Sequence, residues 1–452
     1  MQSAQRAFLR HFLSSLLVAL ALEYLVVPPL LSTTRIGRAI EDTTLDWVIG
    51  MYVGTSPRPG RALVTFTIMD IDDDTYQHWG EPLVVPRDRL LSLIRFAVEG
   101  KARLVIVDVD LSKSVNKAED TGLIRYLARW TEPDPPAVPL IFTRVFHTSR
   151  DGRTPSEPRS SIVDDVVAKS NRIYYAATLF DADADLVIRR WRLWQPTCGH
   201  SLGDSVPSVQ LLTLAILQDP AGQGVRHSLS AIDAFACRYQ VSSDSSRSVP
   251  RLHLGDRALH IDPDHLQRRI IYSLPWRLAS GRARPMVQLD GRPAPLLIVL
   301  SAQDVVEAGR VSAEAVAGRV VIVGGSFSEG RDIYATPVGA MPGAFLLVNS
   351  VHSLLHAQEL THAPEWMRVA LLAILTMLIT ALSQWSWGRG WLPSAIVILV
   401  IVAVGSLYLF RFSIWLEFAV SPIAVIVDHV LHKIGHGVRG VAGLLYEARR
   451  GR

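Results

Sequence analysis

LVTFTIMDIDDDTYQHWGEPLVVPRDRLLSLIRFAVEGKARLVIVDVD is the sequence of residues 63–110, and its order of apolar and polar runs decides the fold class. Leu63 to Ile71 is an apolar run rich in β-branched residues, which is typical of a buried strand. Pro86 to about Glu99 has the helical spacing of an amphipathic helix, with proline at its start. Leu104 to Val109 repeats the buried-strand pattern, so the stretch predicts a strand–helix–strand unit with parallel strands.

The same alternation of strands and helices continues along the chain. It predicts a helix at residues 119–130, strands at Val138 to Phe142 and Ile173 to Leu179, a helix at Ser208 to Leu217, and strands at Leu296 to Leu300 and Val320 to Val323. Continuous apolar strands with helices between them favour an α/β fold with a mainly parallel sheet covered on both faces. Residues 143–170 and 218–260 are rich in Ser, Arg, Asp and Pro, and we expect them to be surface insertions.

Apolar segments flank this region, one before it and three after it, at residues 12–31, 366–385, 391–410 and 414–432. A helix of about 20 apolar residues crosses a bilayer, so we expect a transmembrane helix at each segment. Basic residues gather at both chain ends, which favours the cytoplasm for them. The sequence therefore predicts a multi-pass protein of a bacterial inner membrane, with a cytoplasmic N-terminus at 1–11, a cytoplasmic basic tail at 433–452 and an extracytoplasmic domain at 32–365.

Two features of the apolar segments leave alternatives open. Ala19-Leu20-Ala21 resembles a signal-peptide cleavage site, so the first helix is either an anchor or a segment that is removed. Glu23 lies in the first segment, and Glu417 and Pro422 lie in the last, which is either a kinked span or an interfacial helix. Carboxylates are costly in hydrocarbon, so Glu23 and Glu417 are candidate helix contacts, with each other or with a partner, unless both reach the headgroup layer.

Composition limits the classes of partner. The net charge is only +4, and no Lys/Arg cluster with interleaved aromatic residues occurs, which excludes a nucleic-acid partner. We instead expect the lipid bilayer and a protein partner, or a second copy of the chain, bound through the transmembrane helices. Cys198 and Cys237 both fall in the predicted extracytoplasmic domain, where they form either one disulfide or two free buried thiols. No cofactor is indicated.

Motifs near both ends of the α/β region carry a resemblance to a known family. The first group is IMDIDDDT at 68–75, Trp79-Gly80, Pro86-Arg87 and LVIVDVD at 104–110. The second group is GRVVIVGGS at 318–326, Asp332, Thr336-Pro337, Met341-Pro342-Gly343 and Asn349. In this order and spacing they resemble the CHASE type 2 family, named for cyclases/histidine kinases associated sensory extracellular domains, over about residues 35–432.

The resemblance implies a sensory domain, with two departures from the family pattern. Residues 81–85 stand where family members carry a tryptophan-rich stretch. Family members often have a cyclase, kinase or phosphodiesterase domain after the last helix, whereas here only the tail at 433–452 follows. We therefore expect no attached catalytic domain, and a signal that is relayed to a separate partner.

The candidate ligand site is a polar cluster at the strand ends. Asp70 and Asp72 follow the first strand, Asp108 and Asp110 follow the second, and Arg87 begins the helix between them. Ligands of open α/β sheets bind at the carboxyl ends of the strands, so these positions suit a binding site. The alternative is structural, in which the two aspartates of the first strand cap the following turn and pair with Arg87 or a neighbour.

Two chemical readings of the acidic motif are also open. Asp70 and Asp72 have the spacing of the nucleophile and proton-transfer carboxylates of haloacid-dehalogenase-like phosphatases, although no downstream lysine and acidic pair completes the site. Asp70, Asp72, Asp74 and Glu81 also occupy positions of a calcium loop, in which Thr75 stands where the turn requires glycine.

The last strand adds the remaining candidates. Gly324, Gly325 and Ser326 follow it and form either an anion cradle of backbone N–H groups or a tight turn, with Asp332 shortly after. Three hypotheses remain for the whole chain: a membrane-anchored extracytoplasmic sensor, a structural or assembly subunit of a bacterial membrane complex, and an Asp-dependent phosphohydrolase.

Overall fold

The chain was analysed as a computed structural model, which divides into two compact units: residues 49–359, and residues 1–48 with 360–452. Each unit is described by itself. The structure describes residues 2–21, 24–25, 34–54, 63–114, 116–147, 157–200, 203–219, 225, 230, 232–233, 251–254, 257–261, 266, 268–277, 285–289, 291–307, 310–357, 359–385, 400 and 403–415.

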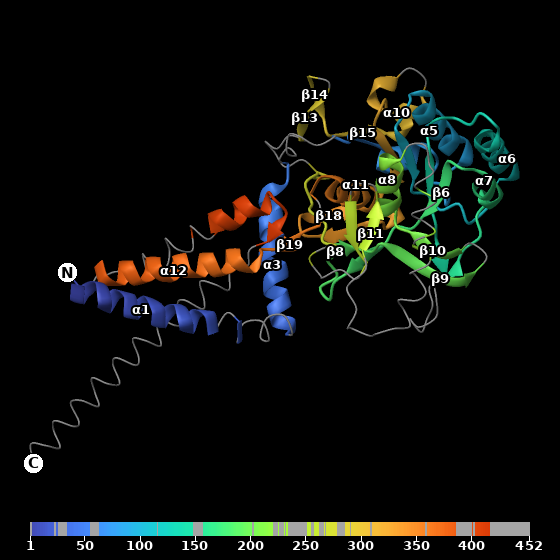
Figure 1. The fold of residues 1–452 in the computed structure, drawn as a ribbon. Helices are drawn as coiled ribbons and strands as arrows, with labels where there is room; N and C mark the ends of the chain where they lie inside the picture. The colour runs from blue at the N-terminus through green and yellow to red at the C-terminus, as the bar shows by residue number, and fades with distance from the viewer. Residues whose placement is uncertain are drawn as a thin grey trace, which may run out of the picture. The chain divides into compact units, whose positions relative to one another are not determined.

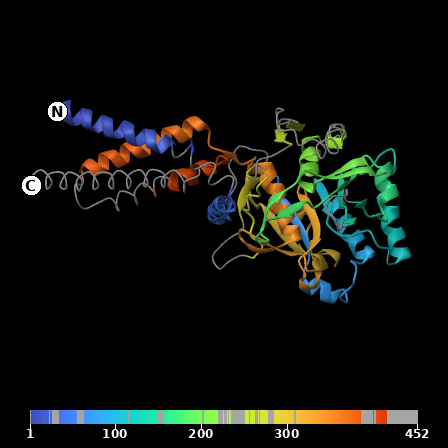
Figure 2. The same ribbon diagram turned by 90° about the horizontal axis from the view of Figure 1, so that it is seen from below.

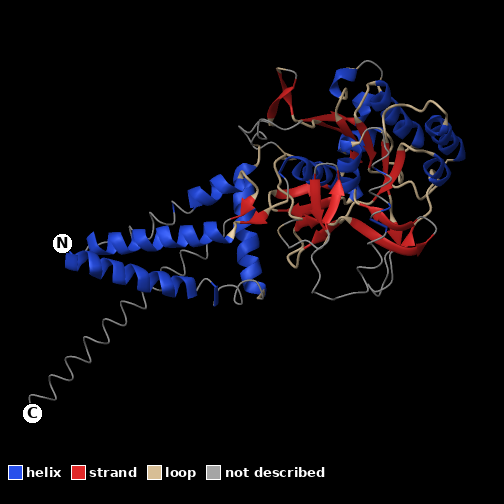
Figure 3. Ribbon diagram, viewed as in Figure 1, coloured by secondary structure: helices blue, strands red, loops and turns tan. Residues whose placement is uncertain are grey.

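A parallel sheet organises the larger unit (Figures 1 and 3). Its six strands have the order β15-β1-β16-β2-β3-β6, and every neighbouring pair is parallel. The strands are β1 (Phe66–Ile71), β2 (Leu104–Val107), β3 (Leu140–Thr143), β6 (Ile173–Ala176), β15 (Leu297–Ser301) and β16 (Val320–Gly325). The predicted α/β class with a mainly parallel sheet is confirmed. Strand β16 is the last of the six in the sequence, yet it lies between β1 and β2, the first two. Both ends of the α/β region therefore meet in the middle of the sheet.

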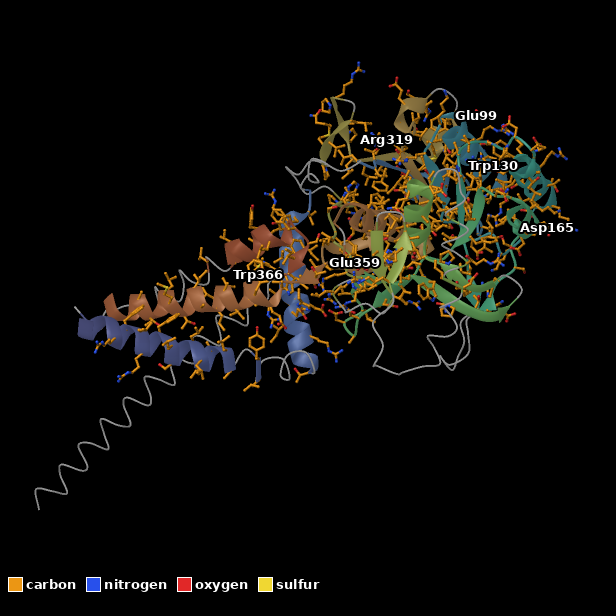
Figure 4. All side chains as sticks on the ribbon, viewed as in Figure 1. Glu99, Trp130, Asp165, Arg319, Glu359 and Trp366 are labelled. Carbon is orange, nitrogen blue, oxygen red and sulfur yellow. The ribbon has the colours of Figure 1, made fainter. Side chains whose placement is uncertain are left out.

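Strand alternation assigns each central residue to one face of the sheet. Met69, Val107 and Val323 point to the first face and belong to its main hydrophobic core. The helices on this face are α5 (Arg87–Glu99), α6 (Lys117–Leu127), α7 (Asp164–Lys169) and α10 (Ala302–Val306). Trp130 completes this core, because it is 2% exposed and its indole N–H donates to the carbonyl of Val138 at 2.9 Å (Figure 4).

The second face is covered by α8 (Val209–Gln218) and α11 (Gly343–His352), which pack on each other (Figure 2). Phe66 points to this face and meets the ring of His352 edge-on, with 6.1 Å between the ring centroids. Asn349 in α11 accepts hydrogen bonds from the backbone N–H groups of Ser273 and Leu274 at 3.0 and 2.9 Å. This buried amide fastens the segment before β13 to the helix.

The predicted limits of helices and strands agree best with the structure where a proline, a glycine or a capping residue marks the end of the element. Helix α5 begins after Pro86 and ends at Glu99, as predicted, and Gly100 is its C-cap. The helix expected at 119–130 begins earlier, because Asn116 caps it, and closes as the 3-10 turn η2 (Ala128–Thr131). Residues 63–65, predicted as part of the first strand, lie outside β1.

Short antiparallel hairpins, which the sequence analysis missed, surround the sheet (Figure 3). Their strands are β4 (Phe146–His147), β5 (Glu157–Pro158), β7 (Phe180–Ala182), β8 (Ile188–Trp191), β9 (Trp194–His200), β10 (Gly203–Pro207), β11 (Arg251–Leu254), β12 (Arg257–His260), β13 (Met286–Leu289), β14 (Arg292–Pro295), β17 (Ile333–Thr336) and β18 (Gly339–Pro342). Strands of this length carry too little apolar periodicity for prediction. Two of the hairpins, β4–β5 and β11–β12, lie within the predicted surface insertions.

The smaller unit contains α1 (Gln2–Ala21) and α12 (Glu365–Trp385), which pack together through the buried side chains of Ala19 and Leu372. Helix α3 (Arg35–Tyr52), which the sequence analysis did not predict, crosses the boundary between the units along the chain. Helix α12 has almost the bounds of the predicted second span, whereas α1 starts ten residues before the predicted first one.

Among the helices that the structure describes, none combines the length and the apolarity needed to cross a membrane. The expected helix at 414–432 does not begin as predicted, because Ile414–Trp415 forms strand β20, which pairs with β19 (Thr361–His362). Residues 416–432 and most of the predicted third span, 391–410, lie outside the described residues.

Candidate functional site

The carboxyl ends of β1, β16 and β2 bring the predicted acidic and glycine motifs together. Asp70 lies opposite Gly324 in the register of β1 and β16, and the N–H of Asp108 donates to the carbonyl of Val323 at 2.8 Å. Alternation places all of these side-chain positions on the face that α11 covers. Open α/β sheets bind ligands at this edge, so the candidate site lies where the fold class favours one.

Asp70 is the most buried carboxylate of the site, with 6% of its surface exposed. Its Oδ2 accepts a hydrogen bond from the Ser326 hydroxyl at 2.8 Å, whereas its buried Oδ1 has no hydrogen-bond partner. Burial raises the pKa of Asp70 to about 6, and the neighbouring charges of Asp72 and Asp73 also raise it, while the bond from Ser326 opposes the shift.

Asp72 has a structural role. It is the N-cap of α4 (Asp73–His78), where its Oδ1 accepts the backbone N–H of Thr75 at 2.8 Å. This is the capping alternative of the sequence analysis. It also overturns the calcium-loop alternative, because residues 70–81 form a strand end and a helix in place of a ligand loop. Within the described residues, no group of three or more His, Cys, Asp or Glu side chains could hold a metal ion.

The segment after β16 is a tight turn fastened to α4. The backbone N–H of Ser326 donates to the carbonyl of Ile71 at 3.0 Å, so it is already used and does not serve an anion cradle. Asp73 accepts the N–H of Ser328 at 2.6 Å, and the rings of Tyr76 and Phe327 stack with centroids 4.4 Å apart. The sequence analysis missed these contacts, since they join residues more than 250 positions apart.

Gly324 and Gly343 let α11 approach the strand ends. A Cβ on Gly324 would lie 2.9 Å from the Cβ of Ala344 and 3.7 Å from that of Asp108. A Cβ on Gly343 would overlap the carboxylate of Asp332. The N–H of Gly343 donates to the backbone carbonyl of Asp332 at 2.9 Å, so the first turn of α11 is held against both segments.

Asp108 and Asp332 form the second acidic part of the site. Burial, and next the charge of Asp332, raise the pKa of half-buried Asp108 to about 7, while a hydrogen bond with Thr143 opposes the shift. Burial also raises the pKa of Asp332, against hydrogen bonds from the Tyr334 hydroxyl and the Gly343 N–H. The pKa of Tyr334 is raised by burial and by the charges of both carboxylates.

Arg87 does not reach the candidate site. Its side chain is buried and donates to the carbonyls of Asp110 and Lys113, each at 3.1 Å. The carboxylate nearest its Nε is that of Asp120, at 3.6 Å, which the sequence analysis had not singled out. Asp110 is exposed, and its carboxylate accepts the N–H of Ser112 at 2.8 Å. Arg87 and Asp110 therefore stabilise the loop after β2 and are not part of the cluster around Asp70 and Asp108.

Four further candidates cannot be placed. Glu23, Glu417 and Cys237 lie outside the described residues, and Cys198 belongs to β9 but its side chain is not described. The predicted helix contacts and the predicted disulfide therefore stay predictions.

The comparison with protein families agrees with this fold and with the motifs at the strand ends. The family model of the CHASE2 domain matches residues 17–383, which is most of the chain, and the chain therefore belongs to the CHASE2 family. This is a family of sensory domains, as the resemblance at 68–110 and 318–349 implied. No curated protein and no solved structure matches the chain.

Proposed function

We propose that this protein is a membrane-anchored sensor whose α/β unit faces the extracytoplasmic space and binds a signal at the carboxyl edge of its sheet. The observation that carries the proposal is the oxygen Oδ1 of Asp70, which is buried without a hydrogen-bond partner at that edge. A buried polar atom without a partner costs free energy, and a bound ligand that donates to it would recover that energy. Membership of a sensory family supports the same reading.

Sensing accounts for the acidic motif better than phosphoryl chemistry does. A phosphatase of the kind weighed above needs both carboxylates of the motif free to react. Here Asp72 is engaged as the cap of α4, and Asp70 is bound to Ser326. Burial raises the pKa of Asp70 most, and the carboxylates of Asp72 and Asp73 raise it further; the negative charge of these neighbours would repel a phosphate group.

The exit of the chain from the α/β unit supports relay to a partner. Glu359 is the last residue of that unit, and its carboxylate accepts hydrogen bonds from Arg268 and from Nδ1 of His260, the latter at 2.7 Å (Figure 4). Helix α12 begins at Glu365, only a few residues further along the chain. A charged clamp at this point would pass a shift of the α/β unit to the helix, and from there to a protein partner or a second copy of the chain.

The test is thermal melting of the full chain in mild detergent against a panel of cationic probes: Mg²⁺, Ca²⁺, spermidine and arginine. A sensor of this kind gives a saturable rise in melting temperature with at least one probe, and Asp70→Ala abolishes the rise. Asp134→Ala, which removes an exposed carboxylate, leaves it unchanged. If no probe raises the melting temperature and a stoichiometric partner co-purifies without any ligand, the chain is an assembly subunit instead.

A further inference from the structure

Helix α3 carries a line of exposed apolar side chains along one side (Figure 1). Ile40, Trp47 and Met51 are 45%, 56% and 40% exposed. At about 100° per residue, these three positions fall within about 40° of one another around the helix axis, so they form one apolar stripe. The opposite side of the helix is buried at Leu45 and Ile49. A stripe of large apolar side chains on a helix that already packs on its other side marks a second contact surface.

The hydroxyl groups beside the stripe are turned back onto the helix. Thr44 lies between Ile40 and Trp47 on the same side, and its hydroxyl donates to the carbonyl of Ile40 at 2.7 Å. The hydroxyl of Thr43, next to it, donates to the carbonyl of Ala39 at 2.7 Å. Both hydroxyls are therefore satisfied within the helix and need no water. Burial of this side in an apolar medium would leave neither of them without a hydrogen bond.

The charged residues of α3 lie away from the stripe. At the helical spacing, each of them is about 100° or more from Trp47 around the helix axis. They are Arg35, Arg38, Glu41, Asp42 and Asp46. An apolar side and a charged side on one helix are typical of a helix that lies in the plane of a membrane interface.

The surroundings of the smaller unit favour lipid as the occupant of this surface. Among the described residues, most of the large apolar side chains that are exposed belong to this unit. Leu17 on α1 and Ile374 on α12, for example, are 70% and 62% exposed. Ile40 and Trp47 belong to the same unit. A bilayer is the one medium that would cover all of these side chains together.

The length of the chain keeps α3 close to the bilayer. Its first residue, Arg35, comes four positions after Leu31, the end of the first predicted span. Four residues of fully extended chain reach at most about 14 Å. The beginning of α3 therefore cannot lie far from the membrane surface on which the α/β unit is proposed to face outwards.

We propose that α3 is an interfacial helix that lies along the outer leaflet, with Ile40, Trp47 and Met51 at the boundary of headgroups and acyl chains. The apolar side of such a helix is buried about 5–10 Å into this boundary, where tryptophan is enriched. The inference rests on the membrane anchoring of the proposed function and adds a lipid-binding surface outside the predicted spans. Along the chain, α3 joins the first predicted span to the α/β unit, so the lipid would hold the helix that connects them.

The experiment is photo-crosslinking of the full chain in nanodiscs of phosphatidylcholine and phosphatidylglycerol. The photoreactive residue p-benzoylphenylalanine replaces Trp47 or Ile40 and, as the matched control on the charged side of the same helix, the exposed Arg38. We expect the first two positions to give several times more lipid adduct than Arg38, measured by the mass of the labelled peptide. Equal yields at the three positions overturn the proposal. A crosslink from Trp47 to a second copy of the chain, in place of lipid, also overturns it and assigns the stripe to self-association.

The same photoreactive residue at Leu25, within the first predicted span, separates this inference from membrane anchoring. Lipid adduct at Leu25 without adduct at Trp47 keeps the anchor and removes the interfacial helix, whereas adduct at neither position removes both. Quenching of tryptophan fluorescence by brominated lipids gives a second measurement without a crosslinker. Trp47→Phe should lower the quenched fraction, whereas Trp130→Phe, in the buried core, should not. An unchanged quenched fraction in Trp47→Phe contradicts the proposal.

Discussion

At the scale of single residues, the two carboxylates of one acidic motif differ in burial and in hydrogen bonding. Asp70 and Asp72 are two positions apart in one motif, yet Asp70 is buried with an unpartnered oxygen and Asp72 caps a helix. Asp70 lies on β1, whereas Asp72 follows the end of that strand and caps α4, so identical side chains meet different surroundings. The sequence shows the motif but not the burial, which depends on α11 and the turn at Ser326.

Asp70→Asn tests this difference through the pH dependence of stability. The pKa of Asp70 is raised in the folded chain from 3.8 to about 6. Because the folded chain binds this proton more tightly than the unfolded chain does, protonation of Asp70 stabilises the fold. This stabilisation is complete below about pH 4 and is lost as pH rises through 6. The asparagine variant lacks that loss, so at pH 7.5 it should exceed the natural chain in unfolding free energy by on the order of 2 kcal/mol.

The measurement is urea denaturation at pH 4.5 and pH 7.5 of the natural chain and the variant. Asp134→Asn serves as the exposed carboxylate control, and we expect it to change the unfolding free energy by less than about 0.5 kcal/mol at both pH values. An Asp70→Asn variant less stable than the natural chain at pH 7.5 would mean that the ionised carboxylate is stabilised by its surroundings.

At the scale of elements, local signals predicted the helices and strands of the sheet, and long-range contacts produced what prediction missed. Pro86 and Gly100 bound α5 within the sequence itself, so its limits could be predicted. The position of β16 between β1 and β2 depends on pairing across more than 200 residues, and no local pattern encodes that order. The same holds for Asp332, whose role appears only when α11 lies beside the strand ends.

Glycine substitutions separate a close approach from an ordinary helical position. Gly324→Ala places a methyl group 2.9 Å from the Cβ of Ala344, so α11 must shift, and we expect a loss of about 1–3 kcal/mol in unfolding free energy. Gly122→Ala, inside α6, meets nothing within 4 Å and should gain about 0.5–1 kcal/mol, because alanine is the better helix former. Chemical denaturation of both variants measures the two changes in unfolding free energy. A Gly324→Ala variant that is as stable as Gly122→Ala would show that α11 does not pack closely on β16.

Arg87 tests what holds the first crossover in place. Its guanidinium joins the start of α5 to two carbonyls of the loop after β2 and to Asp120. Arg87→Ala removes the ion-pair partner of the buried Asp120 carboxylate and the donor to both carbonyls, and should cost about 3 kcal/mol or more. Arg89→Ala, on the exposed side of the same helix, should cost less than about 1 kcal/mol. Denaturant midpoints of both variants measure these losses of stability. If Arg87→Ala costs no more than Arg89→Ala, the hydrogen bonds and the ion pair of Arg87 do not stabilise the fold.

At the scale of the whole molecule, the order of elements along the chain joins the candidate site to the segment proposed to anchor it. The chain enters the sheet at β1, returns to its centre at β16 and follows α11 away from the site. It then passes the turn η5 and the clamp at Glu359 before α12. Along the chain, one helix and one ion-pair cluster thus lie between the last central strand and the first residues of the smaller unit, and the proposed relay would pass through them.

The relay has a use only if the site and the chain end lie on opposite sides of a membrane, and fusion reporters test this. Basic residues at both ends favour the cytoplasm, including Arg6 and Arg10 before the first apolar segment and Arg449 and Arg450 in the tail. Alkaline phosphatase, which is active only outside, should be active when inserted at Ser160 and inactive after Arg452. A fluorescent protein that matures only in the cytoplasm should give the reverse pattern. Phosphatase activity at both positions would place the tail beside the α/β unit, and a partner would then have to read the signal outside the cell membrane.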